Sequence, residues 1–340
     1  MKAVTYSRPG DPSVLEVTEK PLTDPDAGEV RVRLVVSGVN PTDWKSRRTT
    51  HGDSVNEPTV PNHDGAGVVD AIGTDVSGFS IDDRVWVTLA GDGRPASGTA
   101  QEYTVVPAQR VFALPENADF ELGASIGIPA ATAHRALTVA EDGPARLHPG
   151  ALECRTVLVE GGAGAVGNAA IQLARWANAT VIATVSTDTK ATLASAAGAQ
   201  VVVNYQDSDA AKQVRHAAPD GVDQVIEVAA ATNEELDLAV LRPRGTIAIY
   251  ANDRGDEFAV DVARSMALNA RYQFVLLYTV GWDRISAAAA DINLAIAQGA
   301  LRIGEDAGLP IHRFDLEKIS SAHAAVENGA VGKVLILVEG

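Results

Sequence analysis

A glycine-rich segment near the middle of the chain carries the clearest chemistry in the sequence. The β-type run Thr156–Val159 leads through one acidic residue into GGAGAVG, and a helical stretch follows at once. Gly162, Gly164 and Gly167 therefore lie between a strand and a helix. Dinucleotide-binding proteins use this spacing for a tight turn, for close approach of a pyrophosphate and for helix packing, in that order. A turn with a purely structural role is the alternative.

The start of the following helix, at Ala165 and Val166, offers unpaired N–H groups and a positive dipole end to phosphates. An NAD site carries an acidic residue about 20 residues downstream for the ribose 2′-hydroxyl, whereas this chain has Ser186, with Lys190 one helical turn later. Because a hydroxyl and an ammonium suit a 2′-phosphate, we predict NADPH as the cofactor. The alternatives are Ser186 as a helix N-cap and Asp188 displaced toward the ribose.

Length and charge restrict the class of protein. With 340 residues the chain is long enough for two domains. A formal net charge of -16 opposes nucleic-acid binding, and the basic cluster of Lys45, Arg47 and Arg48 suits a small anion or a solvated loop. Cys154 is the single cysteine, which excludes an internal disulfide and a cysteine-built zinc site. Without a visible signal sequence or an apolar run of about 20 residues, we expect a soluble, cytoplasmic protein.

The sequence pattern changes along the chain. Short β-rich runs separated by turn residues predict an antiparallel, barrel-like domain; they are Ala3–Tyr6, Glu29–Val36, Gly67–Ile72, Asp83–Leu89 and Glu102–Val106. Helical stretches such as Ala169–Ala177 then alternate with apolar strands and predict a doubly wound parallel sheet; the strands are Thr156–Val159, Val181–Val185, Val201–Val203, Gln224–Val228, Thr246–Ile249 and Phe274–Leu277. A last helix and strand, Leu316–Glu327 and Lys333–Val338, can return to the first domain.

Longer segments add a more specific signal. They are GVNPTDWK (38–45), HDGAGVVDAIG (63–73), DDRVW (82–86), AQEYTVVPA (100–108), GIPAATAHRAL (127–137), GGAGAVG and VGKVLILV. In these segments the chain resembles, essentially end to end, the medium-chain dehydrogenase/reductase superfamily and within it the zeta-crystallin-like NADPH:quinone reductases. The resemblance implies an α/β protein with a GroES-like β-rich domain, residues 1–124 and 299–340, and a Rossmann NADPH-binding domain, residues 125–298.

The resemblance also implies where NADPH binds. Asn40 matches the asparagine beside the nicotinamide, and Thr132 matches a threonine-type position in the helix between the domains. Ser186, Lys190 and Tyr205 match the positions around the 2′-phosphate. Lys333 matches a position near the phosphate end of the cofactor. The alternatives are helix packing for Thr132, a strand-end aromatic for Tyr205 and a surface charge for Lys333.

Zinc alcohol dehydrogenases of the same superfamily place metal ligands where this chain has Asn40, His63–Asp64 and the region of His134. A catalytic zinc needs three convergent ligands, so we expect no metal. The acceptor should then be electrophilic already, such as a quinone or an α,β-unsaturated carbonyl. Lys45 could stabilise the oxygen that gains negative charge, or it could be a charge at the edge of the cleft.

Other functions stay open at this point. An enone or acyl-thioester double-bond reductase would use the same cofactor, and a cofactor-binding crystallin-like or RNA-binding protein would perform no catalysis. The acceptor depends on loops at residues 49–56 and 91–97, whose shape the sequence does not define. The apolar run Tyr272–Val280 predicts a buried strand. The segment Arg271–Val280 would close the nucleotide-binding sheet, and pairing of that exposed edge with a second copy predicts a homodimer.

Overall fold

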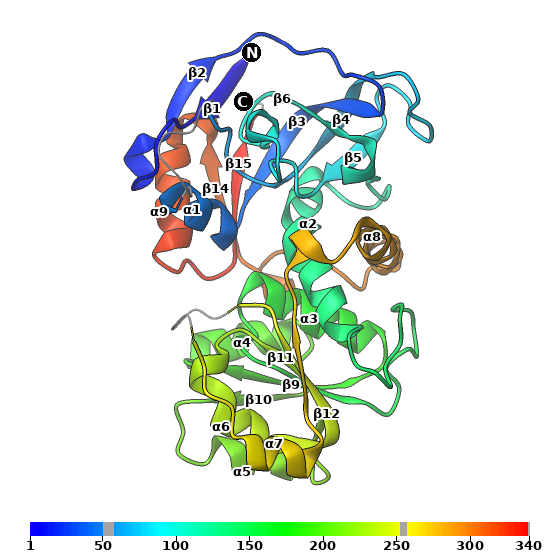
Figure 1. The fold of residues 1–340 in the computed structure, drawn as a ribbon, viewed down its shortest axis with the longest axis vertical. Helices are drawn as coiled ribbons and strands as arrows, with labels where there is room; N and C mark the ends of the chain where they lie inside the picture. Colours follow the sequence, from blue (N-terminus) through cyan, green and yellow to red (C-terminus); the bar gives the residue numbers. More distant parts are fainter. Residues whose placement is uncertain (50–57, 252–256, 339–340) are drawn as a thin grey trace. The chain divides into compact units, whose positions relative to one another are not determined.

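The structure, a computed structural model, describes residues 1–49, 58–251 and 257–338. Most of the predicted acceptor loop at residues 49–56 lies outside these ranges. The chain divides into two compact units. The first comprises Met1–Ile128 with Pro310–Gly340, and the second comprises Pro129–Leu309. Each unit has its own main sheet (Figure 1). Each unit also has its own cluster of buried apolar side chains. Within the described ranges, no helix is both long and apolar enough to cross a membrane.

The first unit is built on a seven-stranded sheet in the order β14-β15-β3-β4-β5-β7, with β6 paired to β3. Only β14 and β15 run parallel within it. Its strands are β3 (Glu29–Val39), β4 (Asp64–Ile72), β5 (Arg84–Val87), β6 (Tyr103–Pro107), β7 (Val111–Ala113), β14 (Ile311–Asp315) and β15 (Lys333–Leu337), and β1 (Lys2–Thr5) pairs with β2 (Glu16–Glu19). Helices α1 (Pro41–Arg48) and α9 (Ile319–Glu327) belong to the same unit. This mainly antiparallel arrangement confirms the predicted GroES-like β-rich domain.

The junction of β3 with α1 positions the polar residues described below. β15 lies between β14 and β3, with Leu335 opposite Gly38. A Cβ at Gly38 would lie 2.0 Å from the carbonyl oxygen of Ala124, so this position requires glycine. Pro41 then begins α1, where its missing N–H and its fixed φ suit the first helical turn. Asn40, between β3 and α1, is thereby held next to the last four residues of β3, which are all buried.

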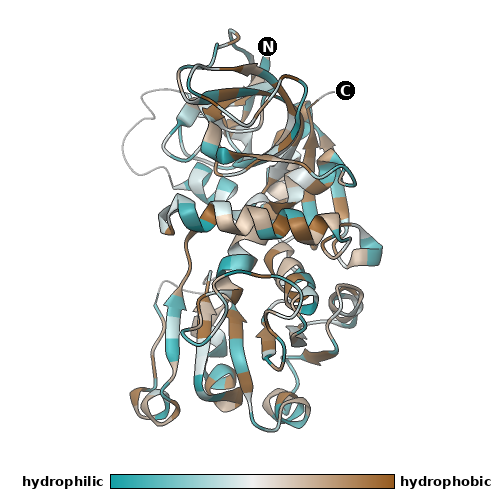
Figure 2. Ribbon diagram, turned by 90° about the vertical axis from the view of Figure 1, so that its right-hand side faces the viewer, coloured by the Kyte–Doolittle hydropathy of each residue, from teal (hydrophilic) through white to brown (hydrophobic). Residues whose placement is uncertain are grey.

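The second unit contains a six-stranded parallel sheet in the order β10-β9-β8-β11-β12-β13, the strand order of a Rossmann fold. Apolar stretches run through its strands (Figure 2). The strands are β8 (Thr156–Val159), β9 (Thr180–Val185), β10 (Val201–Asn204), β11 (Val222–Glu227), β12 (Leu241–Ile249) and β13 (Arg271–Phe274). The helices are α3 (Ala165–Trp176), α4 (Asp188–Ala196), α5 (Ala210–Ala217), α6 (Ala230–Val240), α7 (Val262–Leu268) and α8 (Trp282–Ala297); α2 (Phe120–Leu137) enters from the first unit. The predicted doubly wound sheet is confirmed.

One predicted strand is displaced. The apolar run beginning at Tyr272 was expected to be buried, with a strand at Phe274–Leu277, but β13 ends at Phe274 and a 3₁₀ turn follows at Leu277–Thr279. Phe274 is 63% exposed and Leu276 is 56% exposed. β13 lies at the edge of the sheet, as expected, and only β12 neighbours it there. The apolar pattern predicts this element and its place, but not the residue at which the strand ends or the exposure of its side chains.

Candidate active site

The glycine loop joins β8 to α3 with the geometry that its spacing predicts. A Cβ at Gly167 would lie 2.4 Å from the carbonyl oxygen of Gly161, and one at Gly162 would lie 2.9 Å from the Ala183 side chain. Both glycines are therefore required for packing. Gly164, the N-cap of α3, is exposed, and an added Cβ there would meet only one atom within 4 Å, at 3.5 Å. This open backbone surface, followed by Ala165 and Val166 in the first turn of α3, fits a pyrophosphate.

A second group of polar side chains lies where β9 and β10 end. The Lys190 ammonium donates to Ser186 Oγ at 3.2 Å. Tyr205 follows β10, and its backbone N–H donates to the carbonyl oxygen of Val185 at 3.0 Å, next to Ser186. Thr187, not Ser186, caps α4, because its Oγ1 accepts from the N–H of Lys190. The serine hydroxyl and the ammonium thus lie together at the carboxyl end of β9, where an NAD site would carry an acidic residue.

Asn40 is the centre of a buried polar cluster in the first unit. The Lys333 ammonium donates to Asn40 Oδ1 at 2.6 Å, and Asn40 Nδ2 donates to Asp64 Oδ2 at 2.7 Å. The backbone N–H of Asn40 donates to Asp43 Oδ2 at 2.6 Å. These four residues, called the Asn40 cluster below, are each no more than 3% exposed. Sequence reasoning named Asn40 and Lys333, and Asp64 only as a position aligned with a zinc ligand, but it missed Asp43 and the contacts that join these residues.

Two carboxyl groups and one ammonium share the Asn40 cluster. Burial raises the pKa of Asp43 to about 8, against the hydrogen bond from Asn40, and burial also raises the pKa of Asp64. Burial lowers the pKa of Lys333, while the charges of Asp64 and Asp43 act in the opposite direction. Asp64 is further held by the N–H of Ile128, at 2.8 and 3.0 Å from its two oxygens. The lysine is therefore the positive charge that balances this cluster.

The remaining predicted residues lie outside the Asn40 cluster. Lys45, on α1, is exposed, with its ammonium 5.7 Å from the centroid of the Trp44 ring. Thr132, on α2, is buried at 7% exposure and belongs to the second unit. The structure thus groups Asn40 with Lys333, and Ser186 with Lys190 and Tyr205. It leaves Lys45 as a solvent-facing charge.

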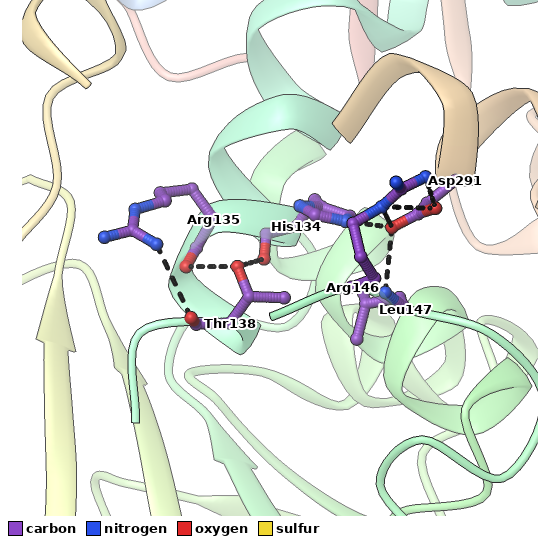
Figure 3. Close-up of polar contacts among 6 residues, drawn as sticks. All are labelled: His134, Arg135, Thr138, Arg146, Leu147 and Asp291. Carbon is purple, nitrogen blue, oxygen red and sulfur yellow. Dashed lines mark hydrogen bonds and ion pairs between the residues drawn. The ribbon is translucent and has the colours of Figure 1, made fainter. Parts of the chain in front are cut away.

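The positions that align with zinc ligands are committed to other contacts. Asn40 uses its amide toward Lys333 and Asp64. His134 Nε2 lies 2.8 Å from Asp291 Oδ2 (Figure 3). Arg146 Nε donates to both oxygens of the same carboxylate, at 3.0 and 2.9 Å. Burial alone would raise the pKa of Asp291, but hydrogen bonds from His134 and Arg146 outweigh it and lower the pKa to about 2. The residues present do not fit a catalytic zinc.

A second buried group of acids, missed in the sequence, lies in the second unit. Glu160, Glu227 and Asp237 offer carboxylate oxygens within 4.8 Å of one another, and the three residues are at most 1% exposed. In the described part of the chain, no ion pair joins them to a lysine or arginine. Burial, together with the charge of Glu227, raises the pKa of Glu160 to about 8, and burial raises those of the other two. We call these residues the acidic cluster.

Comparisons with protein families assign both units. Residues 26–116 match the family described as alcohol dehydrogenase GroES-like domain. Residues 165–293 match the family described as zinc-binding dehydrogenase. The first match covers strands β3 to β7 of the first unit, and the second covers strands β9 to β13 of the Rossmann sheet.

Relatives resemble the chain over its whole length. A quinone oxidoreductase from Lama guanicoe is 30% identical over 346 residues, which is 100% of this chain and 98% of the relative. A mycobacterial protein solved in complex with NADPH is 30% identical, covers 99% of both chains and superposes with a TM-score of 0.81. A structure described as an NAD-dependent alcohol dehydrogenase is 29% identical over 100% of both chains, with a TM-score of 0.86.

Proposed function

This chain belongs to the quinone oxidoreductases of the medium-chain dehydrogenase/reductase superfamily, and we propose that it reduces quinones with NADPH. The observation that carries the proposal is the Ser186–Lys190–Tyr205 group at the ends of β9 and β10. An ammonium beside a hydroxyl attracts a 2′-phosphate, whereas the acid of an NAD site would repel it. The open backbone at Gly164 supports pyrophosphate binding at the start of α3.

The reaction needs no metal in this proposal. Bound NADPH supplies a hydride, which carries two electrons, and a quinone that accepts the hydride and one proton from solvent becomes a hydroquinone, leaving NADP⁺. The protein holds the reactants and stabilises the oxygen that gains negative charge. We assign Asn40 to the nicotinamide side and Thr132 to cofactor contact. Lys45, an exposed residue within α1, is assigned to the developing oxyanion, because an ammonium stabilises an oxygen that gains negative charge.

The cofactor proposal is tested by Lys190→Ala. Losing one charged contact to the 2′-phosphate should raise the Michaelis constant for NADPH about 10- to 100-fold and that for NADH by less than about 3-fold. Lys212→Ala, which removes an exposed lysine from α5 of the same unit, is the matched control and should change neither constant. Equal turnover of the parent enzyme with both cofactors would refute NADPH preference.

The assignment of Lys45 is tested by Lys45→Met with 1,4-benzoquinone as acceptor. Loss of a contact that forms as charge develops should lower kcat and leave NADPH affinity unchanged. Weaker NADPH binding with unchanged turnover would move Lys45 to the cofactor site. No effect on either would make it a surface charge.

We also propose a cytoplasmic homodimer formed through β13. This strand is the free edge of the six-stranded sheet and carries exposed Phe274, while Leu276 beyond it is also exposed. An apolar sheet edge is a ready pairing surface for a second copy. Solution scattering at micromolar concentration should give twice the chain mass, and Phe274→Lys should reduce it. A single-chain mass for the parent protein would contradict the proposal.

A further inference from the structure

Two charged neighbours, Lys333 and Asp64, determine the orientation of the Asn40 side-chain amide. A lysine ammonium only donates hydrogen bonds, so the atom of Asn40 that it contacts at 2.6 Å must be the oxygen. Asp64 also accepts the backbone N–H of Ile128 at both of its oxygens, and as a carboxylate it faces the amide nitrogen of Asn40 at 2.7 Å. Reversing the amide would set an NH₂ group against the ammonium and an oxygen against the carboxylate. Both charge-assisted hydrogen bonds would become repulsive contacts.

We propose that Lys333 is a positioning residue that fixes the Asn40 amide in one orientation. Its oxygen is then directed to the lysine, and one N–H remains for an oxygen of the nicotinamide or of the acceptor. This inference rests on the proposed function, in which Asn40 acts beside the nicotinamide. It assigns Lys333 to the first unit's polar cluster and not to the phosphates of the cofactor, the position that the family resemblance implied.

The burial of Lys333 supports a role inside the protein. At 2% exposure its ammonium already contacts Asn40 and lies near Asp64 and Asp43. A lysine that held a phosphate would instead place its ammonium toward the ligand. The conformation of β15 is well fixed for this purpose, because the backbone N–H of Lys333 donates to Pro310 at 2.8 Å and Val334 pairs with Val39, next to Asn40. Two backbone anchors therefore set the lysine and the asparagine against each other.

A double-mutant cycle tests whether Lys333 acts through Asn40. NADPH oxidation is measured with 1,4-benzoquinone for Asn40→Ala, Lys333→Met and the double variant, and NADPH affinity is measured by fluorescence titration. We expect each single change to lower kcat about 10- to 100-fold, and the double variant to be no more than about 3-fold slower than the slower single one. The dissociation constant for NADPH should change less than about 3-fold in Lys333→Met. Lys318→Met, at an exposed lysine of the same unit, is the matched control.

Two results would overturn the inference. If the two losses multiply in the double variant, Lys333 acts independently of Asn40. If Lys333→Met weakens NADPH binding and spares kcat, the lysine contacts the cofactor. Should Lys333→Met not fold, Asp64→Asn replaces it in the same cycle, because it removes the charge that holds the other end of the amide.

A readout without turnover separates this inference from the proposed function. In protein labelled with ¹⁵N-asparagine, the side-chain amide signal that Asn40→Ala removes identifies Asn40. It should shift or broaden in Lys333→Met and stay unchanged in Lys318→Met. If the parent enzyme does not reduce benzoquinone but this signal responds, the proposed function fails and the inference stands. If the signal does not respond to Lys333→Met, the inference is wrong whatever the activity.

Discussion

The Asn40 cluster and the acidic cluster bury carboxyl groups in opposite ways. In the first unit, Asp43 and Asp64 share their surroundings with the ammonium of Lys333. In the second, Glu160, Glu227 and Asp237 lie within 4.8 Å of one another, and the described residues supply no cation to them. A buried carboxylate must be paired or protonated. In the first group the Lys333 ammonium faces the acids, although Asp43 also keeps its proton up to about pH 8. In the second group, protons on the acids and neutral donors such as Thr184 and Asn233 stand where a cation would be.

The two clusters should therefore respond differently to mutation, although their carboxyl groups are equally buried. Removing the cation from the Asn40 cluster creates an uncompensated buried charge, which is strongly destabilising. Removing an acid from the acidic cluster relieves a repulsion. The following three changes test this contrast, and they are ordered by the size of the expected effect on the free energy of unfolding.

Lys333→Met should lower the free energy of unfolding by about 3 kcal/mol at neutral pH, because it leaves Asp43 and Asp64 without their cation. The loss should grow as the pH rises through about 8, because buried Asp43 ionises there beside Lys333 in the parent, whereas the variant offers no cation to the new charge. Urea unfolding at pH 7 and pH 9 measures both quantities. Lys318→Met should change the free energy by less than about 0.5 kcal/mol. A loss of similar size in this control would show that lysine removal itself, not the cluster, is responsible.

Asp291→Asn tests a carboxylate that is paired more completely than either cluster. It should cost about 2 kcal/mol at pH 7, because His134, Arg146 and the N–H of Leu147 lose an anionic partner. The folded pKa of Asp291, about 2, lies below its unfolded value, so the carboxylate contributes stability above pH 4 that disappears as the pH falls through 2. Thermal unfolding of both proteins from pH 7 to pH 2.5 should therefore converge toward low pH. A constant difference would mean that the carboxylate charge is not the source.

Glu160→Gln should have the smallest effect and the opposite sign. Unfolded glutamate ionises near pH 4.5, whereas buried Glu160 keeps its proton up to about pH 8. The folded state therefore holds the extra proton between these values, and the parent protein loses stability as the pH rises through this window. The glutamine variant escapes that loss and should be about 1 kcal/mol more stable than the parent at pH 8.5, with little difference at pH 5.

The alternative is that a bound cation balances the acidic cluster, and added metal ions test it. If Mg²⁺ or Mn²⁺ raises the unfolding temperature of the parent at pH 8, EDTA reverses the rise and Glu160→Gln abolishes it, then a metal and not shared protons balances the acids. The expected result is no response to either ion in the parent or the variant.

The sequence predicted those parts of the site that are local. The glycine loop, and Ser186 with Lys190, lie within a few residues of a strand end, so the pattern of one βα unit places them. The contact between Asn40 and Lys333 joins residues 293 positions apart, and only the pairing of β15 with β3 creates it. The acidic cluster was missed for the same reason, since Glu160 adjoins the glycine loop but its partners come from β11 and α6. The edge position of β13 agrees with the sequence analysis, whereas the end of the strand at Phe274 and the exposure of that side chain do not follow from the apolar pattern alone.

Because β15 lies near the C-terminal end of the chain, the first sheet can be completed only at the end of synthesis. The second unit is continuous in the chain, whereas the first receives β14 and β15 only after that unit has been synthesised. About 200 residues separate β7 from β15, which at roughly 5–20 residues per second corresponds to tens of seconds on the ribosome. During that interval Asp43 and Asp64 have no Lys333 to balance them, so the end of β3 must remain hydrated and its sheet open at the edge that β15 later covers. The nascent nucleotide-binding unit can fold first, and arrival of the last strand closes both the sheet and the charge balance of the first.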